Sequence, residues 1–336
     1  WAKATKRNDE TKGDMHCWSV WHDNRKFETY RRTSPRFCSE FGFQSFPSSE
    51  VAARFCPPGE AYPGCSAFEW HQKNPGGNER IRKTFEWYFP ELRDAASELL
   101  LSQFQQAMAI QTAVESWRMQ RPHCMGTLYW QLNDNWPVSS WSSLEYGGKW
   151  KILHYRAKRF YAPVAVVGTP GKDSGQAVVW ALNDTPKEQV ATVVVERRDF
   201  AGCILGRDER QVSIPAQGVL NVGTFAREEG TFLVLRLVAD DVTYDGEWLF
   251  DRFKDSPVAK AHIAVKVQGL DVTLTTDVPA FYVWANVAGI QGEFSANAFT
   301  LLPDRPVTIR FKPKGFLSGS ELKKKLKIMH LRDSYE

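Results

Sequence analysis

The chain has 336 residues and a formal net charge of +4, so it is long enough for two or three domains. Its charges are spread along the chain and no Cys/His spacing suits zinc, which argues against a nucleic-acid-binding protein and against a zinc protein. No apolar run approaches about 18 residues, which excludes a transmembrane helix within the sequence. The one basic run, Lys323 to Lys327, is interpreted as a solvated edge, with a nucleic-acid patch as the alternative.

The cysteines and the N-terminal segment bear on the compartment. Six cysteines occur and none forms a CxxC motif, although Cys56 and Cys65 share a Pro/Gly-rich loop and could pair if oxidised. We therefore expect a reducing compartment and a cytoplasmic protein. The first ten residues lack the apolar core of a signal peptide. Because the chain opens in a polar stretch that does not resemble a natural beginning, a lysosomal or secreted location stays open.

Residues 13–164, within a first domain expected at 1–164, alternate strand and helix patterns. Strands are predicted at 13–18, 36–43 and 125–132, the last as a buried parallel strand. Helices are predicted at 94–120 and 149–161, each with apolar residues at helical spacing and a proline just beyond it. This rhythm is typical of a parallel α/β barrel, which takes roughly 250 residues. We therefore expect the last three βα units of a TIM (β/α)8 barrel.

After Pro163 the pattern changes to short alternating strands separated by turn residues, and Pro257 marks a boundary. This favours two immunoglobulin-like β-sandwich domains, at 165–256 and 257–336. The strands are expected at 177–183, 191–197, 218–225 and 231–239 in the first domain, and at 262–268, 271–276, 281–286 and 306–312 in the second.

Glu40 is the leading candidate for chemistry. It lies late in a predicted strand, and the expected apolar surroundings are Phe37, Phe41, Phe43 and Phe46. A carboxylate in such surroundings is costly to bury unless it is paired or used. The alternative is a structural glutamate held by an arginine such as Arg36.

A cluster of three tryptophans begins in the third predicted strand and continues beyond it. Trp130, Trp136 and Trp141 are interleaved with Asn, Asp and Ser side chains. Aromatic faces stack on the C–H surfaces of sugars, and neighbouring amides and carboxylates bind hydroxyls, so the cluster predicts a sugar pocket. A tryptophan-rich core is the alternative.

Several motifs resemble the C-terminal part of a glycoside hydrolase family 2 β-mannosidase. SEFGFQSFP, beginning at Ser39, is similar to the nucleophile strand of that family, and residues 126–155 are similar to its last barrel strand with the loop and helix that follow. GDMHCWSVWHD at 13–23, FEWHQKNPGGNERI at 68–81 and GEFSANAFTLLPD at 292–304 also fit. The resemblance covers nearly the whole chain, but over 165–255 it rests mainly on position.

The resemblance implies a retaining exo-β-mannosidase that removes terminal β-mannose with two carboxyl groups and without a metal or other cofactor. Glu40 takes the position of the nucleophile. The family's acid/base, the Glu of an Asn-Glu pair, precedes the nucleophile and is therefore expected upstream of this chain. Asn78-Glu79 comes after Glu40, so we interpret Asn78 as a helix N-cap rather than as part of the site.

The remaining site predictions are sugar contacts. Trp130 matches the tryptophan that lines the family's mannosyl subsite. The other candidates are His16, Trp18 and Trp21 from the first strand end, Trp70 and His71 from the loop after Glu40, and Asn133 and Asp134 after Trp130. A structural role is the alternative for either histidine, and an Asx turn is the alternative for Asn133 and Asp134.

Two other functions remain open from the sequence. One is a non-catalytic module that binds sugar or a partner chain, and the other is a sibling specificity of the same family, β-galactosidase or β-glucuronidase. The expected partners are a β-mannoside oligosaccharide or glycan and the missing N-terminal portion of the same enzyme, with no nucleic acid and no membrane.

Overall fold

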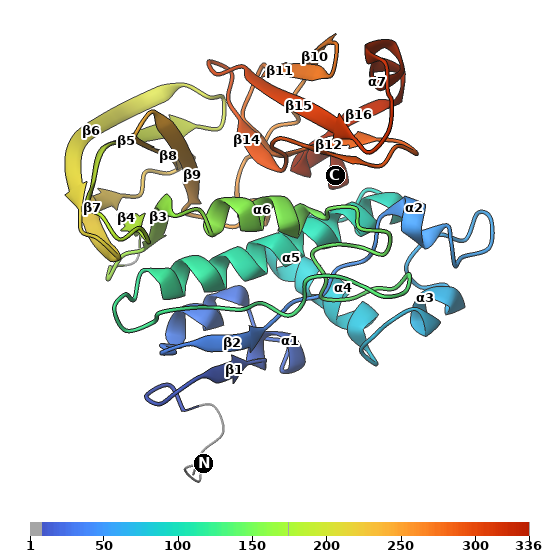
Figure 1. Ribbon diagram of the computed structural model, residues 1–336, viewed down its shortest axis with the longest axis horizontal. Coiled ribbons are helices and arrows are strands. Elements are labelled where there is room, and N and C mark those ends of the chain that lie inside the picture. Colours follow the sequence, from blue (N-terminus) through green and yellow to red (C-terminus); the bar gives the residue numbers. More distant parts are fainter. Residues whose placement is uncertain (1–8, 174, 336) are drawn as a thin grey trace. The chain divides into compact units, whose positions relative to one another are not determined.

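The computed structural model describes residues 9–173 and 175–335 (Figure 1). The chain forms two compact units. The first comprises Trp1–Phe43, Met108–Trp130 and Lys158–Arg252, and the second comprises Gln44–Ala107, Gln131–Ala157 and Phe253–Glu336. No helix in the described residues is both long enough and apolar enough to cross a membrane.

The first unit contains a small parallel sheet. Strand β1 (Met15–Cys17) pairs in parallel with β2 (Cys38–Phe41), as predicted. A third segment runs beside β2, because the amides of Met125, Leu128 and Trp130 donate to the carbonyls of Arg36, Cys38 and Phe41 at 2.8–3.0 Å. Gly126 permits this approach, since a Cβ there would lie 2.2 Å from the Phe37 ring.

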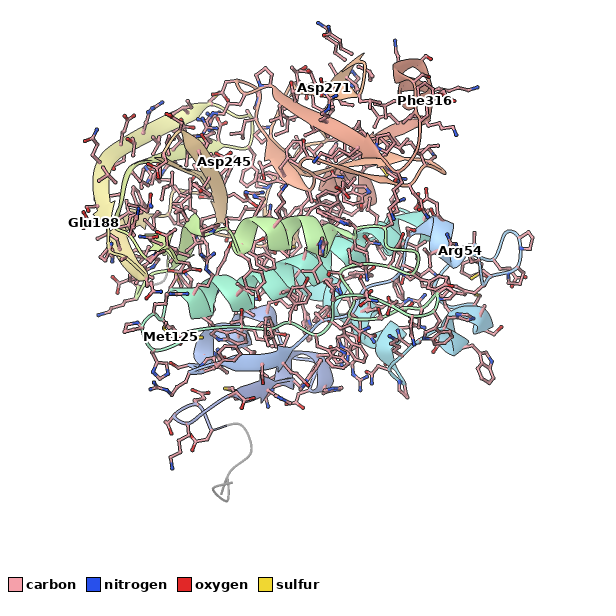
Figure 2. All side chains as sticks on the ribbon, viewed as in Figure 1. Arg54, Met125, Glu188, Asp245, Asp271 and Phe316 are labelled. Carbon is pink, nitrogen blue, oxygen red and sulfur yellow. The ribbon has the colours of Figure 1, made fainter. Side chains whose placement is uncertain are left out.

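The third predicted strand, 125–132, was wrong in two respects. Only Thr127 makes a regular bridge, in parallel to Cys38, so the segment is extended but is not a regular strand. Its apolar side chains are also exposed rather than buried: the exposed fraction is 49% at Met125 (labelled in Figure 2), 58% at Leu128 and 55% at Leu132. The amides of residues 125, 128 and 130 all donate to residues 36–41, and the exposed side chains show that the segment is not covered as a central strand is.

Helix α5 (Ala95–Arg118) confirms the long helix predicted at 94–120. Its C-terminal half packs on the parallel sheet within the first unit. Trp117 is buried there, with its ring edge-on to Phe41 at 4.8 Å and to Tyr30 at 5.6 Å, and its Nε1–H donates to the Tyr30 carbonyl at 3.2 Å. This contact supports the strand that carries Glu40 from the face opposite the carboxylate.

The first unit also holds an antiparallel β-sandwich. Its sheets have the orders β3-β4-β7 and β6-β5-β8-β9. The four predicted strands are present, and β3, β6 and β9 were missed. The bounds are β3 (Val164–Pro170), β4 (Gln176–Asn183), β5 (Gln189–Asp199), β6 (Ile204–Ile214), β7 (Gly218–Ala226), β8 (Thr231–Ala239) and β9 (Val242–Leu249).

The second unit holds the other sandwich, with sheets β10-β11-β15-β13 and β14-β12-β16. The four predicted strands are again present, and three short strands and a helix were missed. The bounds are β10 (Ile263–Gln268), β11 (Asp271–Thr276), β12 (Ala280–Val287), β13 (Gly292–Phe294), β14 (Phe299–Leu301), β15 (Val307–Pro313), α7 (Gly319–Lys325) and β16 (Leu326–Met329). The basic run therefore spans the end of α7 and the start of β16.

Short helices complete the chain. Helix α6 (Ile152–Phe160) confirms the prediction at 149–161, although it begins three residues later. The others are α1 (Ser19–His22), α2 (Ser49–Ala52), α3 (Ser66–Trp70), α4 (Gly77–Tyr88) and the 3-10 helices η1 (Phe27–Arg32), η2 (Phe253–Asp255) and η3 (Leu331–Ser334).

Candidate active site

Glu40 lies in β2 with its side chain about one-third exposed. Its Oε2 accepts a hydrogen bond from Trp18 Nε1 at 3.2 Å and lies 3.3 Å from His16 Nδ1. The parallel register explains the second contact, because His16 in β1 is the ladder partner of Glu40 in β2. No ion pair joins Glu40 to Arg36 in the described part of the chain, so the arginine-held alternative is not what the structure has.

The aromatic surroundings predicted for Glu40 were wrong. Side chains alternate along a strand, so the neighbours of Glu40 point away from it. Phe41 packs on Trp117, and Phe43 lies edge-on to Trp21 at 5.1 Å. The carboxylate is therefore partly solvated, and its partners are an indole N–H and an imidazole.

Trp21 also differs from its prediction as a sugar contact. Its exposed fraction is 1%, and it packs against Phe43 in the core of the first unit. The helix after β1 turns this side chain inward, whereas Trp18, just before that helix, stays near Glu40. Trp21 thus has a packing role.

Trp130 belongs to the same unit as Glu40 and remains 44% exposed. Its backbone N–H donates to the carbonyl of Phe41 at 2.8 Å, one residue beyond Glu40. The parallel pairing therefore brings Trp130 to the same end of the sheet as the carboxylate. An exposed indole at this position offers a flat apolar face to a ligand.

The second unit contains the other predicted sugar contacts. His71 follows α3 and stacks on Phe55 with ring centroids 4.1 Å apart, while Trp136 lies 4.8 Å away. The Nδ1–H of His71 donates to the carbonyl of Pro137 at 2.6 Å. These contacts make His71 a residue that joins two loops, which was the alternative role. Trp70, by contrast, is 82% exposed.

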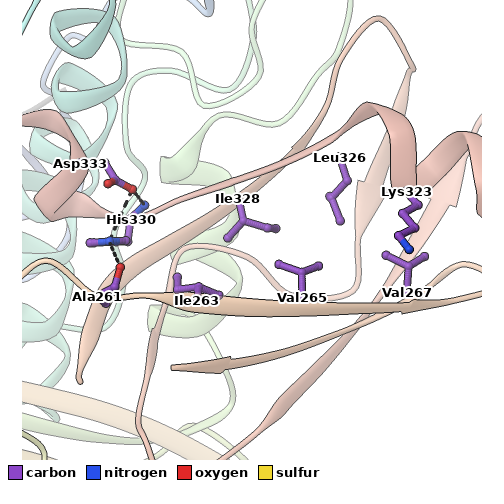
Figure 3. A pocket seen from close by; sticks show the side chains of 9 residues that line it. All are labelled: Ala261, Ile263, Val265, Val267, Lys323, Leu326, Ile328, His330 and Asp333. Atoms are coloured by element: carbon purple, nitrogen blue, oxygen red, sulfur yellow. Dashed lines mark hydrogen bonds and ion pairs between the residues drawn. The ribbon is translucent and has the colours of Figure 1, made fainter. Parts of the chain in front are cut away.

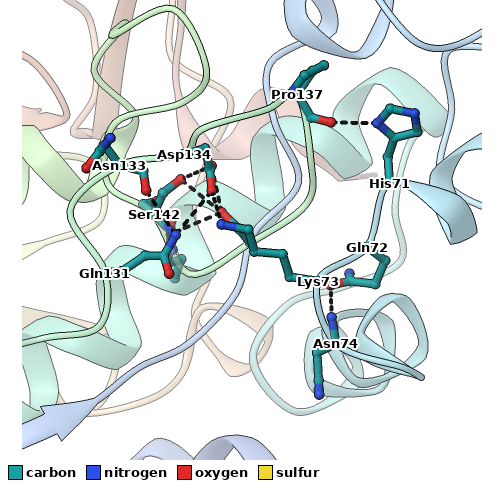
Figure 4. A network of polar contacts seen from close by, with 11 residues as sticks. His71, Gln72, Lys73, Asn74, Gln131, Asn133, Asp134, Pro137 and Ser142 are labelled. Atoms are coloured by element: carbon teal, nitrogen blue, oxygen red, sulfur yellow. Dashed lines mark hydrogen bonds and ion pairs between the residues drawn. The ribbon is translucent and has the colours of Figure 1, made fainter.

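Asp134 organises the loop that follows Trp130 (Figure 4). It is buried, and its carboxylate accepts hydrogen bonds from Lys73 Nζ at 3.0 Å, Ser140 Oγ at 2.7 Å, Ser142 Oγ at 2.5 Å and Gln131 Nε2 at 3.2 Å. These four donors occupy the acceptor sites of the carboxylate, so Asp134 orients the loop and has no acceptor site left for a sugar hydroxyl. Asn133 beside it is exposed.

Sequence reasoning missed two ionisable residues beside this network. Lys151 is buried, and its burial lowers the pKa to about 8, although Asp134 and Glu145 act in the opposite direction. Glu145 is buried too, and burial raises its pKa while the Ser48 amide and hydroxyl, each 2.7 Å away, oppose that change. Both residues lie in a polar segment of the sequence that carries no signal of burial.

Asn78-Glu79 lies at the start of α4, but the expected N-cap was wrong by two residues. The cap is Gly76, whose φ of +72° is the left-handed conformation that glycine tolerates best. Asn78 is buried inside the helix and accepts from Gln72 Nε2 at 2.8 Å. Glu79 is exposed in the first turn, where a carboxylate favours the helix dipole.

Comparison with known proteins adds the family. A model of a mannosidase Ig/CBM-like domain matches residues 175–255, and a model of an Ig-fold domain of mannosidases matches residues 253–334. The β-mannosidase of Capra hircus is 30% identical over 357 residues, covering 96% of this chain. The crystal structure of the β-D-mannosidase from Dictyoglomus thermophilum superposes with a TM-score of 0.87 and 29% identity, covering 96% of this chain.

The chain matches the C-terminal region of the β-mannosidases of glycoside hydrolase family 2.

The matches also show how much of a β-mannosidase is present. The chain spans about 40% of the length of the Capra hircus relative and 41% of the Dictyoglomus thermophilum structure. A β-mannosidase B of Thermothelomyces thermophilus is 29% identical, and the match covers 92% of this chain but only 41% of the relative. The exo-chitosanase CsxA of Amycolatopsis orientalis, at a TM-score of 0.66 and 16% identity, shares the fold alone. The family models strengthen the sequence resemblance over 165–255, where it had rested on position.

Proposed function

We propose that the intact protein containing this chain is a retaining exo-β-mannosidase and that Glu40 is its nucleophile. The observation that carries this proposal is the setting of the Glu40 carboxylate. It lies late in a parallel strand, is one-third exposed, and has one oxygen held by Trp18 and His16. Barrel enzymes use carboxylates at the C-terminal ends of strands, and the relatives named β-mannosidase support the substrate class.

Trp18 and His16 both contact Oε2 of Glu40, so we assign the nucleophilic attack to its Oε1. Oε1 forms a bond to the anomeric carbon as the bond to the leaving oxygen breaks, and a second carboxylic acid protonates that oxygen. The same second group then takes a proton from water, which attacks the anomeric carbon and releases mannose and Glu40. The two carboxyl groups of a retaining enzyme are about 5–5.5 Å apart.

We propose that the acid/base lies in the rest of the polypeptide. Glu79, the alternative within this chain, serves the helix start of α4. The domain division is part of the same proposal: residues 1–164 as the last three βα units of a barrel, then immunoglobulin-like sandwiches at 165–256 and 257–336. The parallel arrangement of β1, β2 and the segment 125–130 supports the barrel portion. The two family models support the two sandwich domains.

Sugar contact is assigned to the side chains that remain accessible. Trp130, next to the carboxylate's end of the sheet, is proposed to contact mannose near its 2-hydroxyl, whose axial direction distinguishes β-mannosides from β-glucosides. Trp70 and Asn133 of the second unit are accessible as well, and sugar contact by them stays a prediction.

The test is covalent labelling of the intact enzyme with a 2-fluoro-mannoside, followed by mass spectrometry of the peptides. We expect the label on Glu40 and its loss in Glu40→Gln, while the control Glu79→Gln keeps both label and turnover. A label on another residue would overturn the assignment. Faster hydrolysis of an aryl β-galactoside or β-glucuronide than of an aryl β-mannoside would assign the sibling specificity instead.

A second experiment concerns the isolated 336 residues. We expect them to be inactive and to associate, because Met125 and Leu128 expose apolar side chains and the proposed acid/base would be absent. Addition of the remaining polypeptide should restore turnover. β-Mannosidase activity of the purified 336-residue chain alone would contradict the proposal and would favour Glu79 as the acid.

A further inference from the structure

The sandwich in the second unit has an open groove between β10 and β16, with a volume of about 450 Å³ (Figure 3). Ile263, Val265 and Val267 of β10 face Leu326 and Ile328 of β16 across it, and Lys323 lies at one end. These residues follow the two-residue period of strands, so each strand presents one apolar face to the groove. The volume is within the range of ligand sites.

The two strands that border the groove are also unpaired on their outer sides. In residues 9–173 and 175–335, β10 pairs only with β11, and β16 pairs only with β12. The sheet that ends in β16 has three strands, one fewer than the sheet that ends in β10. An unpaired edge beside an apolar face is a template for another strand, and proteins normally cover or disrupt such edges.

The chemistry of the groove selects the kind of occupant. Its middle is aliphatic, with His330 and Asp333 at one end and Lys323 at the other, and it lacks the broad Trp, Tyr or Phe face on which a sugar stacks. Lys323 of α7 lines one end of the groove. Lys266 of β10 and Lys327 of β16 are exposed and alternate with the lining residues, so they lie on the outer faces of the two strands. Asp333 at the other end is already engaged, because its carboxylate accepts from the His330 amide at 3.0 Å. The charges that remain beside the groove and on the outer faces of its two strands are therefore mainly positive.

We propose that this groove binds an extended segment of another polypeptide in which apolar residues alternate with acidic ones. The segment adds a strand to β10, its apolar side chains cover Val265 and its neighbours, and its carboxylates face the lysines. A second copy of this chain does not fit this description, because pairing β10 with β10 or β16 with β16 would bring lysines of like charge together.

The direct test uses a fluorescein-labelled nonapeptide in which valine alternates with glutamate, titrated into the intact protein and followed by fluorescence anisotropy. We expect saturable binding that weakens as salt is added. A peptide with lysine in place of glutamate should bind at least about tenfold more weakly. No binding at about 1 mM peptide, or equal binding of the two peptides, would overturn the proposal.

Two matched pairs of variants localise the binding. Val265→Glu should weaken it by about tenfold or more through charge repulsion, whereas Val242→Glu, at a valine of similar exposure on the edge strand β9, should leave it unchanged (42% and 48% exposed). Lys323→Glu should weaken it about threefold or more, and Lys324→Glu, on the same helix but outside the lining, clearly less.

Thermal unfolding of each variant separates loss of binding from loss of folding. Equal effects within either pair would place the peptide elsewhere and overturn the proposal. Sedimentation provides the remaining outcome: a dimer of the intact protein that Val265→Glu dissociates would assign the groove to a second copy and would also overturn it.

Discussion

Lys73 and Asp134 form an ion pair at 3.0 Å that joins two loops of the second unit, with the Asp134 side chain 1% exposed and that of Lys73 22% exposed. Ser140 and Ser142 complete the carboxylate's hydrogen bonds, so the loop after Trp130 is held by a single buried acid. The pairing explains why an aspartate stands in a segment otherwise suited to sugar contact.

Asp134→Asn should lower the free energy of unfolding by about 2–3 kcal/mol, because the Lys73 ammonium loses its counter-charge and the serine hydroxyls lose a charged acceptor. Urea unfolding of the intact protein measures this. Asp23→Asn is the control: its ion pair with Arg25 is more than half exposed on both sides, and its loss should cost less than about 1 kcal/mol. Equal losses in the two variants would contradict a structural role for Asp134.

Lys151 makes stability depend on pH. Its pKa is lowered from 10.5 to about 8 by burial, so between these values the unfolded chain binds more protons than the folded one. Stability from this residue therefore rises with pH from about 8 to 10.5, and the burial of the charge costs about 3 kcal/mol below that window.

The measurement is the difference in unfolding free energy between the parent and Lys151→Met, in which other titrations cancel. The unfolding free energy of the parent should rise relative to that of Lys151→Met as the pH increases from about 8 to 10.5. Lys149→Met, which removes a partly exposed lysine paired with Glu50, should show no such gain. A pH-independent difference for Lys151→Met would mean that the ammonium is not desolvated.

Substitutions at Trp130 and Trp21 should distinguish a role in sugar binding from a role in core packing. Trp130→Phe should raise KM severalfold with the melting temperature nearly unchanged, because its indole is 44% exposed. Trp21→Phe should lower stability by about 1–3 kcal/mol with kcat/KM nearly unchanged, because it leaves a cavity in the core. If Trp130→Phe unfolds the protein or leaves the kinetics untouched, Trp130 is not a sugar contact.

Trp18→Phe tests whether the hydrogen bond from Trp18 orients the proposed nucleophile Glu40. Loss of the N–H that donates to Glu40 Oε2 should lower kcat about tenfold or more with KM nearly constant, because a hydrogen bond to a charged group contributes about 1.5–3 kcal/mol. Steady-state kinetics on an aryl β-mannoside provide the measurement, and circular dichroism checks the fold. An unchanged kcat would show that the contact does not orient the carboxylate.

Much of the sandwich architecture follows from local pattern. β8 and β11 begin and end at the predicted residues, because β8 is a nearly continuous apolar run and β11 alternates apolar and polar side chains, each between clear turns. β6 was missed because Arg207, Asp208, Glu209 and Arg210 give it the composition of a loop. It lies at the edge of its sheet, where such charges remain solvated.

The site was less predictable because its details depend on tertiary contacts. Glu40 was predicted as a site residue from its motif, whereas the contacts that Trp18 and His16 make with it follow from the register of β1 with β2. The inward turn of Trp21 and the burial of Lys151 are set by packing between segments far apart in sequence, which no local pattern encodes.

The pairing of Cys38 with Thr127 has a consequence for biosynthesis. The strand that carries Glu40 leaves the ribosome long before the segment that completes its second side. At roughly 5–20 residues per second, the interval is on the order of ten seconds. During that time the nascent β2 has an unpaired edge, so the segment that carries the proposed nucleophile is exposed to association with other chains until translation has passed Trp130.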